Sequence, residues 1–323
     1  MPDLIRHPVF FWIPAFAGMT IFGVVSCRSN NDREYAMVSQ TLLNGIVMGL
    51  MYVLMASGLT LVFGILRIVN FAHGQFYMLG AFVFYVVLDM AGLGFPIAFI
   101  SSVIAIGLVG LATERGLFRP LAGKALIGII GTTLGLMLFL EGAAELIFGP
   151  GDRNVSVVFP GVLKVAGTTL PVARLVMIGT SAAVMFALYW WIQRTKSGTA
   201  TRAVSQDEYA AGLMGIKKTR CSLLVMGIGS ALAGAAGGTL GPLFYINPYM
   251  GGVPLIKAII VITLGGMGSI FGATLGGLIL GIVEAFAYTY LGGIAEIIGF
   301  LIIIIILIIR PQGLFGEPFE FAE

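Results

Sequence analysis

Long apolar blocks follow one another along this chain and limit what it can fold into. Nine blocks lie at about residues 41–66, 71–90, 95–113, 125–148, 170–192, 221–243, 255–267, 272–290 and 293–309. Only 10% of the residues are charged, against about 25% in ordinary soluble domains. Because a bilayer core has no water to satisfy backbone groups, such segments cross it as helices. We therefore predict an all-α polytopic membrane protein with eight or nine transmembrane helices in the lipid bilayer.

The block at residues 255–267 is shorter than a bilayer crossing requires. It ends at the pair Gly265-Gly266, after which a further apolar block follows at once. We predict a half-helix that breaks at these two glycines before the chain re-enters as the next element. Some of the spans are therefore expected to be discontinuous.

Basic residues indicate which loops face the cytoplasm. Several lie in the loop 114–124, six lie in the segment 194–220, and Arg310 ends the last block. We expect these three places, and with them the C-terminus, to be cytoplasmic. The charge-poor loops around Asp152 and at 245–254 should then be periplasmic. Nine spans would put the start of the first block outside, and eight would put it inside.

A polar segment separates two of the apolar blocks, with the sequence SGTATRAVSQDEYAAGLMG at residues 197–215. It is typical of a short amphipathic helix in which Tyr209-Ala210-Ala211 is followed by Gly215. Small residues at these places would let another protein pack closely. The segment looks like the loop through which a separate ATPase drives the permease of an ABC importer. An ordinary solvated loop is the alternative.

Three further stretches carry a resemblance to a known family. They are LNGIVMGLMYVLMASGLTLVFGILRIVNFAHGQFYMLG at 43–80, ERGLFRPL at 114–121 and INPYMGGVPLIKAIIVITLGGMGSIFGATLGGLILG at 246–281. With the carboxy-terminal RPQGLFG, they closely resemble the permease subunits of high-affinity branched-chain amino-acid ABC importers of the LivH type. The resemblance runs from about residue 40 to the end. Importer docking loops in general have Glu where Tyr209 stands, so the loop alone is a weak signal.

The resemblance implies a non-enzymatic, multi-pass subunit of the bacterial inner membrane that moves branched-chain amino acids. The chain has no Gly-x-x-x-x-Gly-Lys-Ser/Thr phosphate-binding motif, so the energy must come from a partner. The implied partners are a second related permease subunit, two ATPase subunits and a periplasmic substrate-binding protein for leucine, isoleucine or valine. We expect no cofactor, metal, catalytic residue or nucleic acid. The residues expected on the ATPase-docking loop are Arg202, Asp207, Ala210, Ala211 and Gly215.

Polar residues interrupt one long apolar run at Asn70, His73 and Gln75. Polar groups at membrane depth are costly and tend to line a pathway or to pair internally. One interpretation places them on an unwound hinge beside the translocation route, and the alternative is an interfacial turn capped by Asn70. Asn247, followed by Pro248, repeats the theme in the second half of the chain. Asn70 should lie toward the cytoplasm and Asn247 toward the periplasm, as an inverted repeat would give.

Four charged residues lie near or within the apolar blocks. Glu141 and Glu145 are one helical turn apart and share a face toward the periplasmic end. Glu284 is deeper, and Lys257 can pair with it if the last spans pack together. We expect this pair to serve stability in preference to substrate binding.

Other functions have to be weighed against this prediction. A stand-alone secondary transporter would need intramembrane carboxylates for coupling ions, and Glu284 is the deep candidate. An intramembrane enzyme of the HExxH type is not supported, because the chain lacks that motif. Within the permease class the alternative is a urea or short-chain amide importer, because related permeases share NFAHG and GG-x-GS.

Residues 1–36 do not fit the pattern of spans. Their apolar stretch at 10–25 contains Pro14, and RHPVFFWIPAFAGMT resembles translated intergenic repeats at the front of mispredicted bacterial reading frames. Met37 begins MVSQTLLNGIVMGL directly before the first strong span. We therefore expect residues 1–36 to be a mispredicted extension or disordered. Residues 37–323 should form a single transmembrane permease domain.

Overall fold

The computed structural model describes residues 30–155, 159, 161–165, 168–243, 245–310 and 313–315. In chain order the elements are α2 (Asn30–Leu66), α3 (His73–Tyr85), η2 (Val86–Met90), α4 (Phe95–Thr113), η3 (Glu114–Phe118), α5 (Arg119–Leu121), α6 (Leu126–Phe148), β1 (Val162–Val165), β2 (Thr168–Pro171), α7 (Val172–Arg194), α8 (Lys196–Gln206), α9 (Glu208–Leu213), α10 (Lys218–Leu240), η4 (Gly241–Leu243), α11 (Gly252–Gly265), α12 (Ile270–Leu291), η5 (Gly292–Ile294) and α13 (Ala295–Ile309). Residues 1–29 of the expected extension lie outside the described part. The predicted all-α membrane fold is confirmed.

Six helices among the described residues are long and apolar enough to cross a bilayer. They are Met37–Leu66, Phe95–Leu121, Ile127–Phe148, Val172–Arg194, Lys218–Leu240 and Ile270–Ile294. The other apolar blocks form shorter helices, α3 with 13 residues, α11 with 14 and α13 with 15. A crossing needs about 20 residues, so a short helix crosses only together with the irregular chain beside it. The predicted break is confirmed, because α11 ends at Gly265 and Gly266 has a φ of 98°.

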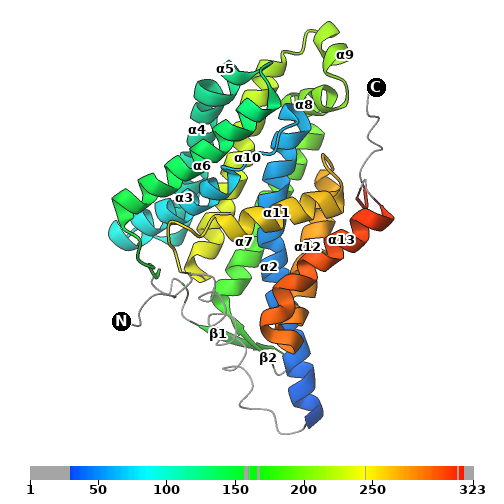
Figure 1. Ribbon diagram of the computed structural model, residues 1–323. Coiled ribbons are helices and arrows are strands. Elements are labelled where there is room, and N and C mark those ends of the chain that lie inside the picture. The colour runs from blue at the N-terminus through cyan, green and yellow to red at the C-terminus, as the bar shows by residue number, and fades with distance from the viewer. Residues whose placement is uncertain are drawn as a thin grey trace, which may run out of the picture.

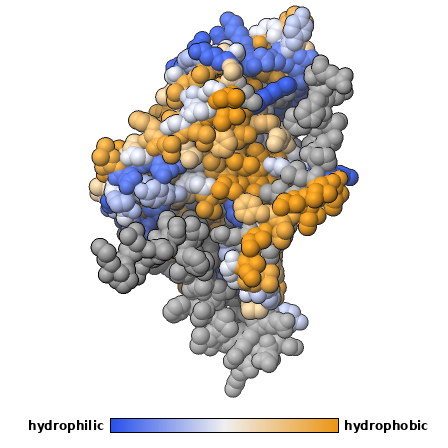
Figure 2. Space-filling model, in the orientation of Figure 1, coloured by the Kyte–Doolittle hydropathy of each residue, from blue (hydrophilic) through white to orange (hydrophobic). Residues whose placement is uncertain are grey.

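Helices α2 and α10 form the centre of the bundle. The most apolar window is 83% buried in α2 and 78% buried in α10, against 28%, 17% and 22% in the spans of α4, α6 and α7. The outer helices therefore present apolar side chains outward, and Figure 2 shows a broad hydrophobic surface across the middle of the molecule. Burial of this kind places lipid around the outer helices and protein contacts around α2 and α10.

The contacts between helices repeat in two halves. Helix α2 packs on α12 and α11, while α10 packs on α4 and α3, and α2 and α10 also contact each other. Exchanging α2 with α10, α3 with α11 and α4 with α12 converts each contact into another that is present, including α3 on α4 and α11 on α12. This exchange is the contact pattern that the predicted inverted repeat requires.

Two glycine pairs lie where the halves meet. Gly58 of α2 faces Gly229 of α10, and a Cβ added to Gly58 would lie 2.6 Å from the Gly229 carbonyl oxygen. Gly74 at the start of α3 faces Gly251 just before α11, and a Cβ on either would overlap the other's carbonyl group. The absence of side chains lets these backbones touch, which is the usual way in which helices gain contact inside a bilayer.

Loops that are distant in sequence gather at the two ends of the bundle. In Figure 1, α5, α8 and α9 lie at the top, which we call the α8 end, and the β1–β2 hairpin lies at the bottom, the hairpin end. Strands β1 and β2 pair antiparallel, with Val162 opposite Pro171. The sequence had given no sign of this hairpin. A separate bridge joins Arg153 to Ile246, with both N–H···O distances at 2.9 Å.

Candidate functional site

The first predicted pathway segment is a buried turn between α2 and α3. The Asn70 side-chain oxygen accepts a hydrogen bond from the Ala72 amide at 3.0 Å. The His73 ring begins α3 and packs on α2, where a Cβ at Gly58 would lie 3.1 Å from it. Gly58 precedes the end of α2 at Leu66 by about 12 Å along the helix axis. Asn70 and His73 are fully buried, so both side chains lie inside the bundle.

The second predicted segment repeats this turn before α11. The Asn247 side-chain oxygen accepts from the Tyr249 amide at 3.0 Å, as Asn70 does in the other half. The Asn247 amide group also donates to Asp152 at 2.9 Å. Asn247 is partly exposed, so the two turns match in geometry and differ in burial. Pro248 follows it, which disfavours a helical Asn247 and keeps the segment irregular.

Polar side chains link α3, α6 and the loop before α11. Gln75 donates through Nε2 to a Glu141 carboxylate oxygen at 3.2 Å. Glu145 lies close enough to Tyr249 to raise the pKa of the Tyr249 phenol above its ordinary value. The two glutamates therefore belong to the surroundings of the helix breaks and are not solvated apart from them.

Several buried polar atoms near the turn at Asn70 lack a hydrogen-bond partner among the described residues. They are the hydroxyls of Ser57, Thr60 and Tyr77, Nδ2 of Asn70 and Oε1 of Gln75. A buried polar atom without a partner costs about 1–3 kcal/mol. The centre of the bundle thus has hydrogen-bonding capacity that the described residues do not meet.

The predicted docking loop forms two short helices at the α8 end. Thr195 caps α8 by accepting from the Gly198 amide, and Asp207 caps α9 by accepting from the Ala210 amide at 2.9 Å. Arg202 is exposed and donates to Gln193 at 3.1 Å. The polar, Ser- and Thr-rich sequence thus provides its own helix caps.

The α9 segment exposes large apolar side chains in place of small ones. Tyr209, Leu213 and Met214 are 78%, 73% and 82% exposed. Ala210 is exposed beside them, whereas Ala211 is buried and packs into the protein's own core. We define Tyr209, Ala210, Leu213 and Met214 as the α9 surface. Exposed apolar side chains in a charged segment are typical of a contact with another protein.

Gly215 ends α9 in a conformation that favours glycine. Its φ is 82°, and the Ile216 amide donates back to the Ala211 carbonyl at 3.1 Å. This is the glycine-terminated helix ending known as the Schellman motif. The predicted importance of Gly215 therefore has a local cause, because a side chain there is strained although the space around it is open.

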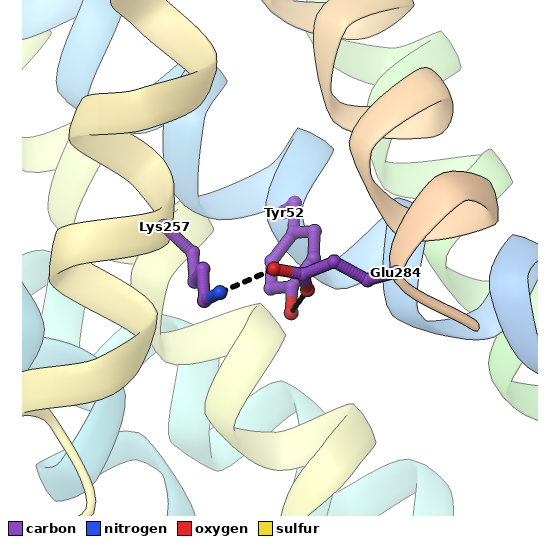
Figure 3. Close-up of polar contacts among 3 residues, drawn as sticks. All are labelled: Tyr52, Lys257 and Glu284. Carbon is purple, nitrogen blue, oxygen red and sulfur yellow. Dashed lines mark hydrogen bonds and ion pairs between the residues drawn. The ribbon is translucent and has the colours of Figure 1, made fainter. Parts of the chain in front are cut away.

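A buried ion pair connects α11 and α12, and Tyr52 of α2 lies beside it. Lys257 pairs with one oxygen of Glu284, and the Tyr52 hydroxyl donates to the other at 2.6 Å. Figure 3 shows Lys257 and Glu284 pointing toward each other with Tyr52 beside them. The side chains of Lys257 and Glu284 are only 6% and 1% exposed. The predicted pairing is confirmed.

Comparison with known proteins places this fold and these segments in one family. A family model described as the branched-chain amino acid transport system / permease component matches residues 41–309. The chain belongs to this family. The match includes both helix breaks, the α9 surface and the buried ion pair.

Individual relatives of this permease align over most of their length. The high-affinity branched-chain amino acid transport system permease protein BraD of Pseudomonas aeruginosa is 35% identical, over 86% of this chain and 96% of BraD. LivH of Escherichia coli K12, another permease protein of such a system, is 34% identical, over 89% of this chain and 98% of LivH. The permease protein LivM of the same organism is 25% identical, over 86% of this chain and 71% of LivM.

Sequence reasoning missed several polar contacts of the permease. Arg174 of α7 is buried and donates to Asn44 of α2. Glu114 is also buried, and it accepts from Ser222 of α10 at 3.0 Å. The sequence does not predict the contact of Tyr52 with Glu284, since a tyrosine in an apolar run has no evident partner. Arg174 and Glu114 could have been found from the sequence, because each is a charged residue inside or at the edge of a span.

The helix ending at Gly215 gives a direct test of how the permease positions α9. A β-branched Gly215→Val variant must adopt a positive φ at a cost of roughly 1–2 kcal/mol, so we expect it to loosen α9. Gly215→Asn tolerates this conformation better and is the matched control. Limited proteolysis of the purified permease should cut the Val variant faster near α9. Equal cutting of both variants would contradict the structural role of Gly215.

Proposed function

We propose that this chain is a membrane-spanning subunit of an ABC importer that moves branched-chain amino acids across the bacterial inner membrane. It is not itself an enzyme and uses no cofactor. The family and the names of the relatives support the substrate class. The urea or short-chain amide alternative has no comparable support.

The α8 end faces the cytoplasm in this proposal. Basic residues concentrate there, at Arg115 and Arg119 around α5 and along the segment 194–220, and positive charge favours the cytoplasmic side. The C-terminus follows α13 to the same side. The hairpin end then faces the periplasm, where a substrate-binding protein delivers the amino acid.

The observation that carries the proposal is the α9 surface. A charged, water-facing segment has no internal reason to expose three large apolar side chains, and a partner that covers them gains about 25 cal/mol for each Å² removed from water. Two ATPase subunits would dock here and on a second, related permease subunit. The similarity to both LivH and LivM supports a pair of related permeases.

The helix breaks supply the proposed pathway. Asn70, His73, Gln75 and Asn247 lie on or beside the two irregular segments that meet at Gly74 and Gly251. Non-helical backbone at membrane depth is tolerated where it is buried in protein or lines a water-filled path. We propose that these segments border the route of the amino acid when the two permease subunits move.

A stand-alone secondary transporter is disfavoured by the surroundings of Glu284. A coupling carboxylate must release and rebind an ion, whereas Glu284 is held by Lys257 and Tyr52. A subunit driven from outside by ATPases needs no such carboxylate.

A charge placed on the α9 surface tests the docking. We expect Met214→Asp to stop the ATPase subunits from co-purifying with the permease, because an unpaired carboxylate would be desolvated in the contact. Glu208→Gln is the control on the same segment. It breaks only the exposed pair with Lys218 at 2.5 Å, which is worth about 0–1 kcal/mol. Normal ATPase recovery and leucine uptake with Met214→Asp would refute the docking surface.

A further inference from the structure

Two loops that are distant in sequence are bonded to each other beside the second helix break. We call residues 149–155, which follow α6, the strap, and residues 245–251, which precede α11, the break segment. Arg153 of the strap and Ile246 of the break segment exchange both backbone hydrogen bonds, each with an N–H···O distance of 2.9 Å. Figure 1 shows the end of α6 and the segment before α11 side by side at the lower left of the bundle. The strap is therefore bonded directly to the second helix break.

Side chains continue this bridge by one residue on each strand. In an antiparallel pair, the residues beside a doubly bonded pair lie opposite each other, and here they are Asp152 and Asn247. The Asn247 amide group donates to the Asp152 carboxylate at 2.9 Å. Asp152 is exposed and Asn247 is half-buried, so water can replace these bonds at a low net cost when the two loops separate.

Apolar side chains of the break segment lie beneath the polar bridge. Ile246 is fully buried and Met250 is 2% exposed, and both belong to the main hydrophobic core of the bundle. A zwitterion cannot pass side chains packed in this way, because its charged ends would lose their water without gaining partners. The break segment, held by the strap, therefore closes the proposed route toward the hairpin end.

The strap itself is anchored on α3 and α6. The Arg153 guanidinium donates to the Phe148 carbonyl at the end of α6 and lies over the Tyr85 ring of α3, 5.6 Å from its centre. Phe148 in turn stacks on Phe82 of α3, with the ring centres 4.2 Å apart. The bridge from Arg153 to Ile246 thus joins the α3–α6 side of the bundle to the segment that leads into α11.

The two ends of α11 are held differently. The amides of Leu314 and Phe315 donate to the last two carbonyls of α11, at 2.8 and 3.1 Å, so the carboxy-terminal segment caps this end. Lys257, farther back on α11, is paired with Glu284 of α12. The amino end begins after Gly251, which provides no side-chain cap. A movement of α11 would therefore pivot near its carboxyl end and displace the break segment.

We propose that the strap and the break segment form the periplasmic gate of the permease, which is closed in this structure and opens when the bridge between Arg153 and Ile246 breaks. This inference rests on the proposed function and adds to it the place where the amino acid enters from its binding protein. The turn at Asn70 is fully buried, whereas Asn247 is partly exposed. The break at Asn247 is thus the one that water and substrate reach first.

A disulfide across the bridge gives the first test. Residues opposite each other beside a doubly bonded pair normally have Cα atoms about 4.5 Å apart, which is within the range that a disulfide spans. We expect Asp152→Cys/Asn247→Cys, in a Cys27→Ala/Cys221→Ala background, to oxidise in the resting importer. After reconstitution with the ATPases and the loaded binding protein, the oxidised form should lose leucine uptake and regain it on reduction. A bridge with a structural role alone would transport normally when locked.

A disulfide within the hairpin is the matched control. Leu163 and Leu170 lie opposite each other on β1 and β2, at the same end of the molecule but within one hairpin. The oxidised Leu163→Cys/Leu170→Cys variant should keep its uptake. Normal uptake by the oxidised Asp152→Cys/Asn247→Cys variant would overturn the gate, and so would its failure to oxidise at rest. A wild type that imports no branched-chain amino acid would instead refute the proposed function.

Labelling of a buried cysteine measures the opening directly. A membrane-impermeant maleimide, added on the side of the binding protein, should react with Ile246→Cys during turnover with ATP and not at rest. Ala233 of α10 is also fully buried, and Ala233→Cys should stay unreactive in both conditions. Met250→Cys, beneath the same bridge, replaces Ile246→Cys if that variant does not assemble. Equal labelling at rest and during turnover would overturn the gate even in an importer that transports leucine.

Discussion

The Lys257→Met variant should yield much less folded permease than the wild type. Removing the ammonium group leaves the Glu284 carboxylate buried with Tyr52 as its remaining partner, and breaking a buried ion pair from one side costs about 3–5 kcal/mol. That loss is comparable to much of the total stability of a domain. Gly299 of α13 covers the pair closely, with 3.0 Å between a Cβ there and Glu284, so water has little room to enter. The amount of monodisperse permease after detergent extraction measures the effect.

The double variant Lys257→Met/Glu284→Leu distinguishes the charge from the packing. Apolar side chains of similar size often replace a buried ion pair at little cost, so we expect the double variant to recover much of the folded protein. Tyr52→Phe should cost less, about 1.5–3 kcal/mol, because it removes a single hydrogen bond to a charged group. A double variant as unstable as Lys257→Met would mean that shape, and not charge, is what the site requires.

An alanine at Gly251 should disrupt the permease more than its size suggests. Its Cβ would lie 2.7 Å from the Gly74 carbonyl carbon and 3.0 Å from Gln75 Oε1. Overpacking costs about 1–3 kcal/mol where side chains can shift, and here the obstacle is the Gly74 backbone. We expect Gly251→Ala to abolish leucine uptake and to lower the melting temperature of the purified permease.

The neighbouring Gly252 provides the control for this prediction. A Cβ at Gly252 meets nothing within 4 Å, and the residue lies at the same helix start. Gly252→Ala should therefore keep both uptake and melting temperature. If Gly251→Ala behaves like Gly252→Ala, the close approach of the two half-helices is not required, and the proposed pathway loses its geometric basis.

The sequence predicted the features that depend on the chain's own chemistry. The length of the apolar blocks predicted the helices, and the pair Gly265-Gly266 predicted the end of α11. The pairing of Lys257 with Glu284 was predicted because both residues lie in the last apolar blocks of the chain. The residue types at Asn70 and Asn247 gave the two turns, which share the same hydrogen bond to the amide two residues later. Whether Asn70 and Asn247 serve a pathway stays a prediction.

The sequence could not predict the features that depend on which helices contact each other. The contacts of Gly58 with Gly229 and of Gly74 with Gly251 join residues far apart in the chain, and no spacing rule within one helix predicts them. Glycines four residues apart make close contacts in α10 and α12, for example Gly237 and Gly281, whereas Gly131 and Gly135 of α6 meet nothing within 4 Å. The sequence pattern of α9 does not show that Leu213 and Met214 are exposed, because that depends on how α9 packs on its neighbours. Only the observed exposure separates Ala210 from the buried Ala211.

The crossed packing of the two halves has a consequence for how the permease is made. Helix α2 leaves the ribosome first, but much of the surface that buries it belongs to α10, α11 and α12. At synthesis rates of roughly 5–20 residues per second, about ten to forty seconds pass between the end of α2 and the start of α12. During that interval the Tyr52 hydroxyl has not yet met Glu284, and α2 must be held by lipid or by the insertion machinery. The nascent chain therefore completes its core only when its last third arrives, so truncation late in translation should leave an early helix exposed to membrane quality control.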